Sequence, residues 1–481
     1  MSVEYKKTKE WVLAEAIHSM YQAPLYHLIL EGLLLLWIFR LLFFKSYKIQ
    51  NKVPLSEKEK DDLIAEWTPE PLVPDLQKTL NLSTPYKEIT GRPGKTIIVD
   101  GKPCLNLASM NFLGLLGNER VAEKSSASIR KYGVGACGPR AFYGTVDVHV
   151  ELEDRLAEYM GTERAISYAY GFATIASAIP AYAKRGDIIF VDEAVCFAIQ
   201  KGLHASRSNL VYFRHNDLND LEEKLKLQEK QDKKDPKKAS VTRKFMVVEG
   251  LYMNTGQICD LPRLVELKYK YKVRLFVEES LSFGVLGDTG RGVTEHFNIP
   301  IEKVDLVVGS LEYALASIGG FCCGRGYVVD HQRLSGHGYV FSASLPPLLA
   351  RAAVEGLNIM QDDPGIFSRI RGKGQLMQEL LKDIPEIEVT GYQQSPSFHI
   401  RRKNSTDRSE NLKFLKLLVE QCFENEVCIS IASRLAHEEH MSDWNPSVRV
   451  AVSVEMDEKD LKKAAEVIKQ AAQHAELQMT H

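Results

Sequence analysis

The run VRLFVEES, residues 273–280, is short, apolar and rich in residues that favour β-strands. Four runs of the same kind lie before and after it: DIIFVDE (187–193), NLVYF (209–213), KFMVVEG (244–250) and VDLVVGS (304–310). Helical patterns separate these runs. Because strands that are apolar along their whole length are buried on both faces, this alternation predicts a mostly parallel sheet covered by helices, an α/β fold.

Two further parts of the chain extend this fold. GGFCCGRGYVVD (319–330) reads as a strand that turns back at the edge of the sheet. A helical pattern begins near Leu345 and is followed by three strand candidates and an amphipathic helix: EIEVTGY (387–393), SFHIRR (397–402), SVRVAVSVE (447–455) and Glu458 to His474. We therefore expect a large domain over 91–345 and a smaller C-terminal α+β domain over 346–481.

The composition is that of an ordinary folded protein. With 481 residues, 44% of them hydrophobic, the chain can bury the cores of two or three domains. Its 61 basic and 63 acidic residues nearly cancel, which argues against nucleic acid as a partner. The eight cysteines form no CxxC pairs and have no interleaved histidines, so we predict reduced thiols in the cytosol and neither a metal site nor a disulfide framework.

The apolar run Tyr26–Phe44, YHLILEGLLLLWIFRLLFF, is about as long as a helix must be to cross a bilayer. We predict a transmembrane helix over 23–45, with a buried core helix as the alternative. The residues that follow offer no small-residue cleavage site, so we expect a retained single-pass anchor and not a signal peptide. Glu31 and Arg40 are costly in lipid, which predicts that they face a partner helix or that Arg40 reaches the interface.

The flanks of this run predict its orientation. Four basic residues lie at its end or beyond: Arg40, Lys45, Lys48 and Lys52. By the positive-inside rule the main body is then cytosolic, although three lysines near the N-terminus weaken the asymmetry. Residues 1–22 carry apolar positions at helical spacing and predict an amphipathic segment on the membrane surface. Residues 46–90 are charged, contain prolines and read as a linker.

Several motifs follow one another in a fixed order. They are LNLASMNFLGLLGN (105–118), YGVGACGPRAFYGTVDVHVELEDRLAEYMG (132–161), VVEGLYMNTGQICDLPRL (247–264), SFGVLGDTGRG (282–292), GSLEYALASIGGFCCG (309–324) and FSASLPP (341–347). Each is weak alone, but together they resemble the α-oxoamine synthase family over residues 90 to 470. The resemblance implies an aspartate-aminotransferase-like fold of type I, and enzymes that use pyridoxal phosphate to condense an amino acid with an acyl-CoA.

That chemistry requires particular side chains. A lysine amine must capture the cofactor aldehyde and later move a proton at the substrate α-carbon. A carboxylate must pair with the pyridine nitrogen, and an aromatic ring or imidazole must stack on the cofactor. Hydroxyls and the N–H groups of a helix start hold the phosphate.

This sequence departs from the family at the positions that match those roles. Tyr313 stands at the lysine of the family's Ser-Lys-Ala-Leu-Gly stretch, which here reads Glu312 to Ala316, and a phenol cannot form a Schiff base. Glu278 replaces the pyridine-binding Asp, Leu281 replaces a His, and Cys196 stands at the stacking His. We therefore predict no catalytic residue and no covalently bound cofactor in this chain. The alternative is a lysine elsewhere, but the nearest basic residues flank the motif on the wrong side.

Family members are dimers in which each active site is completed by the neighbouring subunit. By resemblance, Phe341, Ser342 and Ser344 match a segment that reaches the neighbour's cofactor phosphate, and Ser342 is the preferred candidate. The alternative is that these serines cap the helix that begins near Leu345.

Three more positions belong to the expected shared cleft by the same resemblance. Cys137, in the glycine-rich loop Gly133–Gly138, and Asn111 are expected to shape it. Arg449 matches the family's carboxylate-binding arginine, but a site without cofactor gives it no substrate to hold, so we interpret it as a relic.

Three strings, LYMNTG (251–256), DHQRLSG (330–336) and NPSVRVAVSVE (445–455), resemble the non-catalytic long-chain-base subunits of eukaryotic serine palmitoyltransferase. Those subunits usually carry an amide at the lysine position, so Tyr313 departs from their pattern without restoring an amine. The resemblance implies a heterodimer at the endoplasmic reticulum membrane, in which a lysine-bearing catalytic subunit binds pyridoxal phosphate and condenses serine with palmitoyl-CoA to 3-ketosphinganine.

The same resemblance implies a small activating membrane subunit and an inhibitory membrane regulator as further partners. Two alternatives stay open. One is a self-sufficient acyltransferase that uses pyridoxal phosphate on another lysine, and the other is a catalytically silent scaffold or lipid sensor.

Overall fold

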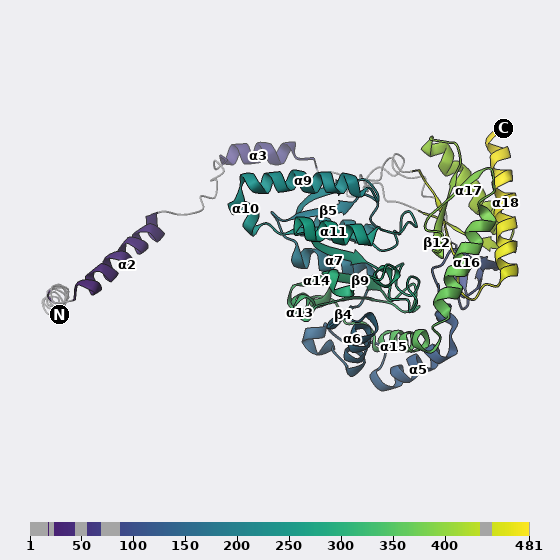
Figure 1. Ribbon diagram of the computed structural model, residues 1–481, viewed down its shortest axis with the longest axis horizontal. Coiled ribbons are helices and arrows are strands. Elements are labelled where there is room, and N and C mark those ends of the chain that lie inside the picture. Colours follow the sequence, from purple (N-terminus) through teal and green to yellow (C-terminus); the bar gives the residue numbers. More distant parts are fainter. Residues whose placement is uncertain (1–17, 19–23, 44–54, 69–86, 433–444, 481) are drawn as a thin grey trace. The chain divides into compact units, whose positions relative to one another are not determined.

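The computed structural model describes residues 18, 24–43, 55–68, 87–432 and 445–480, and the chain divides into two compact units, 1–83 and 84–481 (Figure 1). In the first unit, helix α2 spans Leu25–Phe43, and its side chains are not buried. It is long and apolar enough to cross a membrane, as the sequence predicts. The amphipathic segment expected over 1–22 lies outside the described residues, apart from His18.

A second helix, α3 (Glu57–Glu66), lies within the stretch that the sequence predicts as a linker. Its first turn is closed by a capping box. The Ser56 hydroxyl accepts the Glu59 N–H at 3.3 Å, and the Glu59 carboxylate accepts the Ser56 N–H at 2.8 Å. The linker prediction therefore missed a helix whose start signal, Ser56-x-x-Glu59, is present in the sequence.

A seven-stranded sheet forms the centre of the second unit, in the order β4-β10-β9-β8-β7-β5-β6. Its strands are β4 (Arg164–Tyr168), β5 (Ile188–Asp192), β6 (Asn209–Phe213), β7 (Lys244–Glu249), β8 (Arg274–Glu278), β9 (Leu306–Ser310) and β10 (Gly320–Gly324). Strands β5 to β9 pair in parallel. The predicted α/β fold with a mostly parallel sheet is confirmed.

Strand β10 turns back as expected, but it does not lie at the edge of the sheet. It is antiparallel to β9 on one side and to β4 on the other. Strand β4, whose run RAISY was not predicted as a strand, pairs with its outer side. Strand β10 is therefore internal to the sheet, and the edge strands are β4 and β6. The residues after Gly324, read as a continuation of the strand, instead form helix α13 (Gly326–Ser335).

Helices surround this sheet, and most of them share its core. They are α5 (Glu119–Tyr132), α6 (Asp147–Met160), α7 (Gly171–Tyr182), α8 (Phe197–Ser206), α9 (Leu218–Lys234), α10 (Pro236–Val241), α11 (Leu261–Tyr271), α12 (Val293–His296), α13, α14 (His337–Val340) and α15 (Pro347–Asp362). Helix α7 packs on α8, and α15 packs on both α5 and α6, as Figure 1 shows for α5, α6 and α15. The charged stretch before β7 forms α9 and α10.

The C-terminal part has a core of its own around a four-stranded antiparallel sheet, in the order β11-β12-β15-β14. Its elements are α16 (Ile366–Leu381), β11 (Ile387–Thr390), β12 (Ser397–Arg402), α17 (Arg408–Glu424), β14 (Ser430–Ile431), β15 (Val448–Ala451) and α18 (Glu458–Thr480). A further small sheet joins β1 (Ile89–Thr90), β2 (Thr96–Val99), β3 (Lys102–Asn106) and β13 (Val427–Cys428). All three C-terminal strand candidates contain strands of the structure.

Candidate functional site

Three neighbouring parallel strands end side by side in polar residues. Strand β7 ends at Glu249, β8 at Glu278 and β9 at Ser310. Glu249 and Glu278 lie opposite each other in the ladder. Since open parallel sheets bind ligands outside the carboxyl ends of their strands, this edge is the candidate site.

The loop between β9 and β10 brings Tyr313 to this edge. Burial raises the pKa of the Tyr313 phenol, and the carboxyls of Glu312 and Glu278 and the thiol of Cys196 raise it further, whereas the Arg449 guanidinium lowers it. The structure therefore gathers four residues that the sequence singled out separately. We name the group the Tyr313 cluster; it consists of Cys196, Glu249, Glu278, Glu312, Tyr313 and Arg449.

The two strand-end carboxyls of the cluster are buried. Burial raises the pKa of Glu278 to about 7, against hydrogen bonds from the hydroxyl and N–H of Ser280. Burial and the Glu278 carboxylate also raise the pKa of Glu249, although Glu249 accepts the N–H groups of Cys196 at 2.6 Å and Met253 at 3.0 Å. Sequence reasoning missed Glu249, whose signal is its place at the end of a strand next to the one that ends in Glu278.

The guanidinium of the cluster comes from the C-terminal sheet. Arg449 lies on β15, and its Nη1 is 3.7 Å from the Met253 sulfur. Among the described residues, the buried Nε of Arg449 has no hydrogen-bond partner. Burial lowers the pKa of Arg449, and the Tyr313 phenol opposes that shift. Arg449 thus faces a phenol where a carboxylate would pair with it better.

The cluster does not fit pyridoxal phosphate, the cofactor that the resemblance implies. Capture of the cofactor aldehyde needs an amine, and Tyr313 offers a phenol. The residue before it, Glu312, adds a carboxylate where the family has a hydroxyl. Leu281 is 2% exposed and packs in the core of the large sheet, where an apolar side chain replaces the family's imidazole.

A second group of predicted residues lies on two surface segments that are bonded to each other. The Gly138 carbonyl accepts both the N–H of Ser344 at 3.0 Å and its hydroxyl at 2.9 Å. A side chain at Gly144 would come within 2.0 Å of the same carbonyl, so the loop closes only with glycine there. We name these segments, Gly133–Gly144 and Phe341–Pro347, the loop pair.

The loop pair presents large side chains to solvent. Phe341 is 77% exposed and Phe142 62%, while Tyr143 is fully exposed on a backbone with φ of 64°. Cys137 is exposed and also has a positive φ, of 56°. Phe142 and Tyr143 were not predicted as site residues, although AFYG lies within the quoted glycine-rich motif.

The serines of the loop pair differ from each other. Ser344 is buried and its hydroxyl is bound within the chain, whereas the Ser342 hydroxyl donates to the Gly338 carbonyl from a half-buried position. Helix α15 begins at Pro347 with Pro346 as its N-cap and without a side-chain cap. The alternative that these serines cap this helix is therefore wrong.

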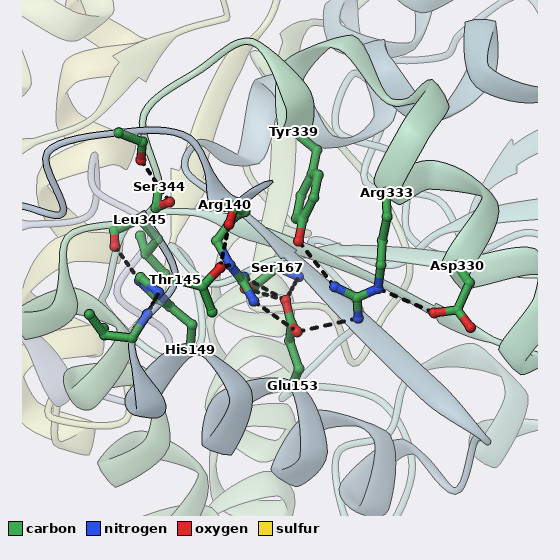
Figure 2. A network of polar contacts seen from close by, with 12 residues as sticks. Arg140, Thr145, His149, Glu153, Ser167, Asp330, Arg333, Tyr339, Ser344 and Leu345 are labelled. Atoms are coloured by element: carbon green, nitrogen blue, oxygen red, sulfur yellow. Dashed lines mark hydrogen bonds and ion pairs between the residues drawn. The ribbon is translucent and has the colours of Figure 1, made fainter. Parts of the chain in front are cut away.

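A buried polar network lies beneath the loop pair (Figure 2). Arg140 binds both carboxylate oxygens of Glu153, at 2.6 and 3.1 Å, and also contacts the hydroxyls of Ser167 and Thr145, each at 3.0 Å. Arg333 approaches the same carboxylate at 3.5 Å. The side chains of Arg140 and Glu153 are only about 5–6% exposed, which makes this a buried ion pair with nearly all of its hydrogen bonds filled.

His149 connects this network region to the second segment. Its Nε2 donates to the Leu345 carbonyl at 2.6 Å, and its Nδ1 accepts the Val146 N–H at 3.2 Å. These two hydrogen bonds set the tautomer of the ring, and burial lowers the pKa of His149. A cavity of about 620 Å³ opens beside Arg140 and Arg333, and not over Tyr313.

Asn111 is the remaining predicted residue. It is 7% exposed, and its Nδ2 has no hydrogen-bond partner among the described residues. The next residue, Phe112, donates its N–H to the Tyr313 carbonyl at 3.1 Å, so Asn111 lies beside the loop that carries Tyr313.

Comparison with known proteins agrees with this fold. The model of the class I and II aminotransferases matches residues 102–468. A solved serine palmitoyltransferase of Sphingomonas wittichii superposes with a TM-score of 0.71 at 22% identity, covering 90% of this chain and 100% of that one. The likeness confirms the predicted type I fold and, at this identity, shows the fold alone.

Two curated relatives are similar over nearly their whole length. Long chain base biosynthesis protein 1c of Oryza sativa subsp. japonica is 43% identical over 451 residues, which cover 93% of this chain and 91% of that protein. Serine palmitoyltransferase 1 of Dictyostelium discoideum is 39% identical over 470 residues, which cover 96% and 95%.

Proposed function

The chain belongs to the family of long chain base biosynthesis protein 1 and serine palmitoyltransferase 1, and from that membership we propose that it is the non-catalytic subunit of a serine palmitoyltransferase. It pairs with a lysine-bearing catalytic subunit of the same fold. The pair condenses serine with palmitoyl-CoA to 3-ketosphinganine and releases CO2 and CoA. Pyridoxal phosphate, which supplies the electron sink for this chemistry, is held by the partner.

The Tyr313 cluster carries this proposal. It occupies the strand edge where a ligand of this fold binds, and it presents a phenol where the reaction needs an amine. Its carboxyls Glu249 and Glu278 have raised pKa values, and burial is the main cause for both. Burial thus disfavours the ionised carboxylate that a pyridine nitrogen needs as its partner.

The loop pair supports a role for this chain at the partner's active site. Its exposed aromatic side chains, Phe341, Phe142 and Tyr143, form the type of surface that protein interfaces bury. Ser342, next to Phe341 in the chain, is half-buried and offers a short hydroxyl. We keep Asn111 as a contributor to the shared cleft; its buried Nδ2 has no hydrogen-bond partner among the described residues.

Helix α2 supports a membrane anchor. We propose that it places the complex at the endoplasmic reticulum as a single span with the main body in the cytosol, and that Glu31 and Arg40 contact the small activating subunit and the inhibitory regulator. Within the helix, His27 Nδ1 lies 3.8 Å from the Glu31 carboxylate, so the two polar side chains lie on the same face.

Co-expression of the full chain with a lysine-bearing homologue tests the proposal. Borohydride reduction of the purified complex fixes a pyridoxyl group to the lysine that holds the cofactor, and peptide mass spectrometry assigns that lysine to one chain. We expect the group only on the partner, and turnover only in the complex.

Two outcomes would contradict this expectation. A pyridoxyl group on this chain, together with turnover by the chain alone, would identify a self-sufficient enzyme with a relocated lysine. A partner that is equally active without this chain would reduce the chain to a scaffold or lipid sensor.

A further inference from the structure

Helix α7 begins next to the Tyr313 cluster without a cap of its own. It spans Gly171–Tyr182, and Tyr170 at its N-cap makes no side-chain hydrogen bond. The first N–H groups of a helix have no partner within the helix, and the helix dipole makes this end favourable for an anion. A helix start of this kind is where proteins place phosphate groups.

The Glu312 carboxylate fills this helix start from within the chain. Burial raises the pKa of Glu312, and the Gly171 N–H, which donates to the carboxyl group, opposes that shift. The Glu312 carboxyl group lies close to the helix start. A Cβ atom at Gly171 would lie 3.1 Å from Glu312 Oε1 and 2.8 Å from Ser310 Oγ. The Glu312 backbone is fixed too, because its N–H donates to the Ser310 hydroxyl at 3.0 Å.

Glu312 also adjoins the position where a cofactor lysine would stand. The aldehyde and the phosphate of pyridoxal phosphate belong to one small molecule, so a phosphate site must lie within a few ångströms of the amine. The start of α7 meets that requirement, because Glu312 contacts it while the next residue is Tyr313. A hydroxyl at position 312, as in the resembling family, would donate to a phosphate; a carboxylate repels it.

Building on the proposed function, we propose that the Glu312 carboxyl group occupies and closes the phosphate site of this chain, so that the chain excludes phosphorylated cofactors by two independent means. Tyr313 removes the amine that would capture the aldehyde. Glu312 occupies the N-terminus of helix α7, which would otherwise hold the phosphate. Restoring a lysine at position 313 alone is then insufficient to restore cofactor binding.

Full-length chain in complex with its lysine-bearing partner tests this inference. Three versions of the chain are compared: Tyr313→Lys, Tyr313→Lys with Glu312→Ser, and Tyr313→Lys with Glu302→Ser. Glu302 is exposed and lies outside the cluster, so its replacement is the matched control. Each complex is titrated with pyridoxal phosphate and reduced with borohydride, and the pyridoxyl group at position 313 is quantified by peptide mass spectrometry.

We expect labelling of position 313 in the Glu312→Ser version at a cofactor concentration at least about a hundredfold below that needed by the other two. Labelling of the partner's own lysine in the same sample checks that each complex is folded and loaded. Equal labelling of all three versions, or of none, would overturn the role of Glu312. Labelling of the unsubstituted chain is the separate result that would overturn the proposed function.

Discussion

Buried charged groups are poorly paired in the Tyr313 cluster and well paired beneath the loop pair. In the cluster, Glu249 and Glu278 face each other with raised pKa values, and the Arg449 Nε has no hydrogen-bond partner among the described residues. Beneath the loop pair, Arg140 and Glu153 are joined by two hydrogen bonds and supported by further hydroxyls. The difference indicates that the chain depends on accurate geometry beneath the loop pair and less so in the Tyr313 cluster.

The comparison also separates a buried site from an exposed surface. The cluster is enclosed and chemically silent in our proposal, whereas the loop pair shows aromatic side chains to solvent on a backbone that several bonds hold in place. A network with filled hydrogen bonds fixes one arrangement, while unpaired buried groups only lower stability. We therefore expect changes in the two regions to separate stability from turnover.

The largest effect is expected from Arg140→Ala, which leaves the Glu153 carboxylate buried without its main partner. Loss of one member of a buried ion pair costs about 3–5 kcal/mol, so the melting temperature of the complex should fall together with its turnover. Arg164→Ala is the control: Arg164 is 59% exposed and lies 3.9 Å from Asp330, where the loss should stay below about 1 kcal/mol. Equal losses in both variants would remove the distinction between the two regions.

A pH-dependent effect is expected from Glu278→Gln. The folded-state pKa of Glu278, about 7, lies above the ordinary value of 4.5, so its protonated form stabilises the fold at low pH and this contribution is lost as pH rises from about 4.5 through 7. The wild-type chain should lose up to about 3 kcal/mol of stability over that range relative to Glu278→Gln. Thermal unfolding at pH 5 and pH 8 measures this, with Glu302→Gln as an exposed control; parallel curves for wild type and Glu278→Gln would refute it.

A smaller effect, on turnover alone, is expected from the joint change Phe341→Ala and Ser342→Ala. Phe341 is exposed and packs little in its own chain, so stability should hold, while partner turnover falls about tenfold, equivalent to roughly 1.4 kcal/mol. Val241→Ala, an exposed apolar residue on α10, is the matched control. Unchanged turnover would leave the scaffold alternative in place.

The smallest effect is expected from Tyr313→Phe. The change removes only the phenolic hydroxyl, which has no catalytic part in our proposal. The free energy of unfolding and the activation free energy of turnover should therefore stay within about 0.5 kcal/mol of the wild type. Steady-state assays of the complex and thermal unfolding check both quantities. A severalfold drop in turnover would give the cluster a part in the reaction.

The sequence predicted those parts of this molecule that depend on local pattern. The central strands were found because parallel strands are apolar along their length, and Tyr313, Glu278 and Cys196 were found because a known motif order located them. Strand β4 was missed, since Arg164, Ala165 and Ser167 give RAISY a weaker strand pattern than the other central runs, and its partner β10 lies far away along the chain.

What the sequence could not show depends on contacts between distant segments. Glu249 joins Cys196 only when α8 is folded against β7, across 53 positions of chain. The Gly138–Ser344 bonds span 206 positions, and neither end has a distinctive residue type. Such pairings arise from strand order and helix packing, which a single sequence does not reveal.

The adjacency of Glu312 and Tyr313 has an evolutionary consequence. A single codon change that returned lysine to position 313 would meet a carboxylate already seated on helix α7 and would gain no function for selection to keep. Two specific changes would have to coincide. In the proposed heterodimer, the division of labour between unlike subunits is thereby protected against drift to a symmetrical pair of active sites.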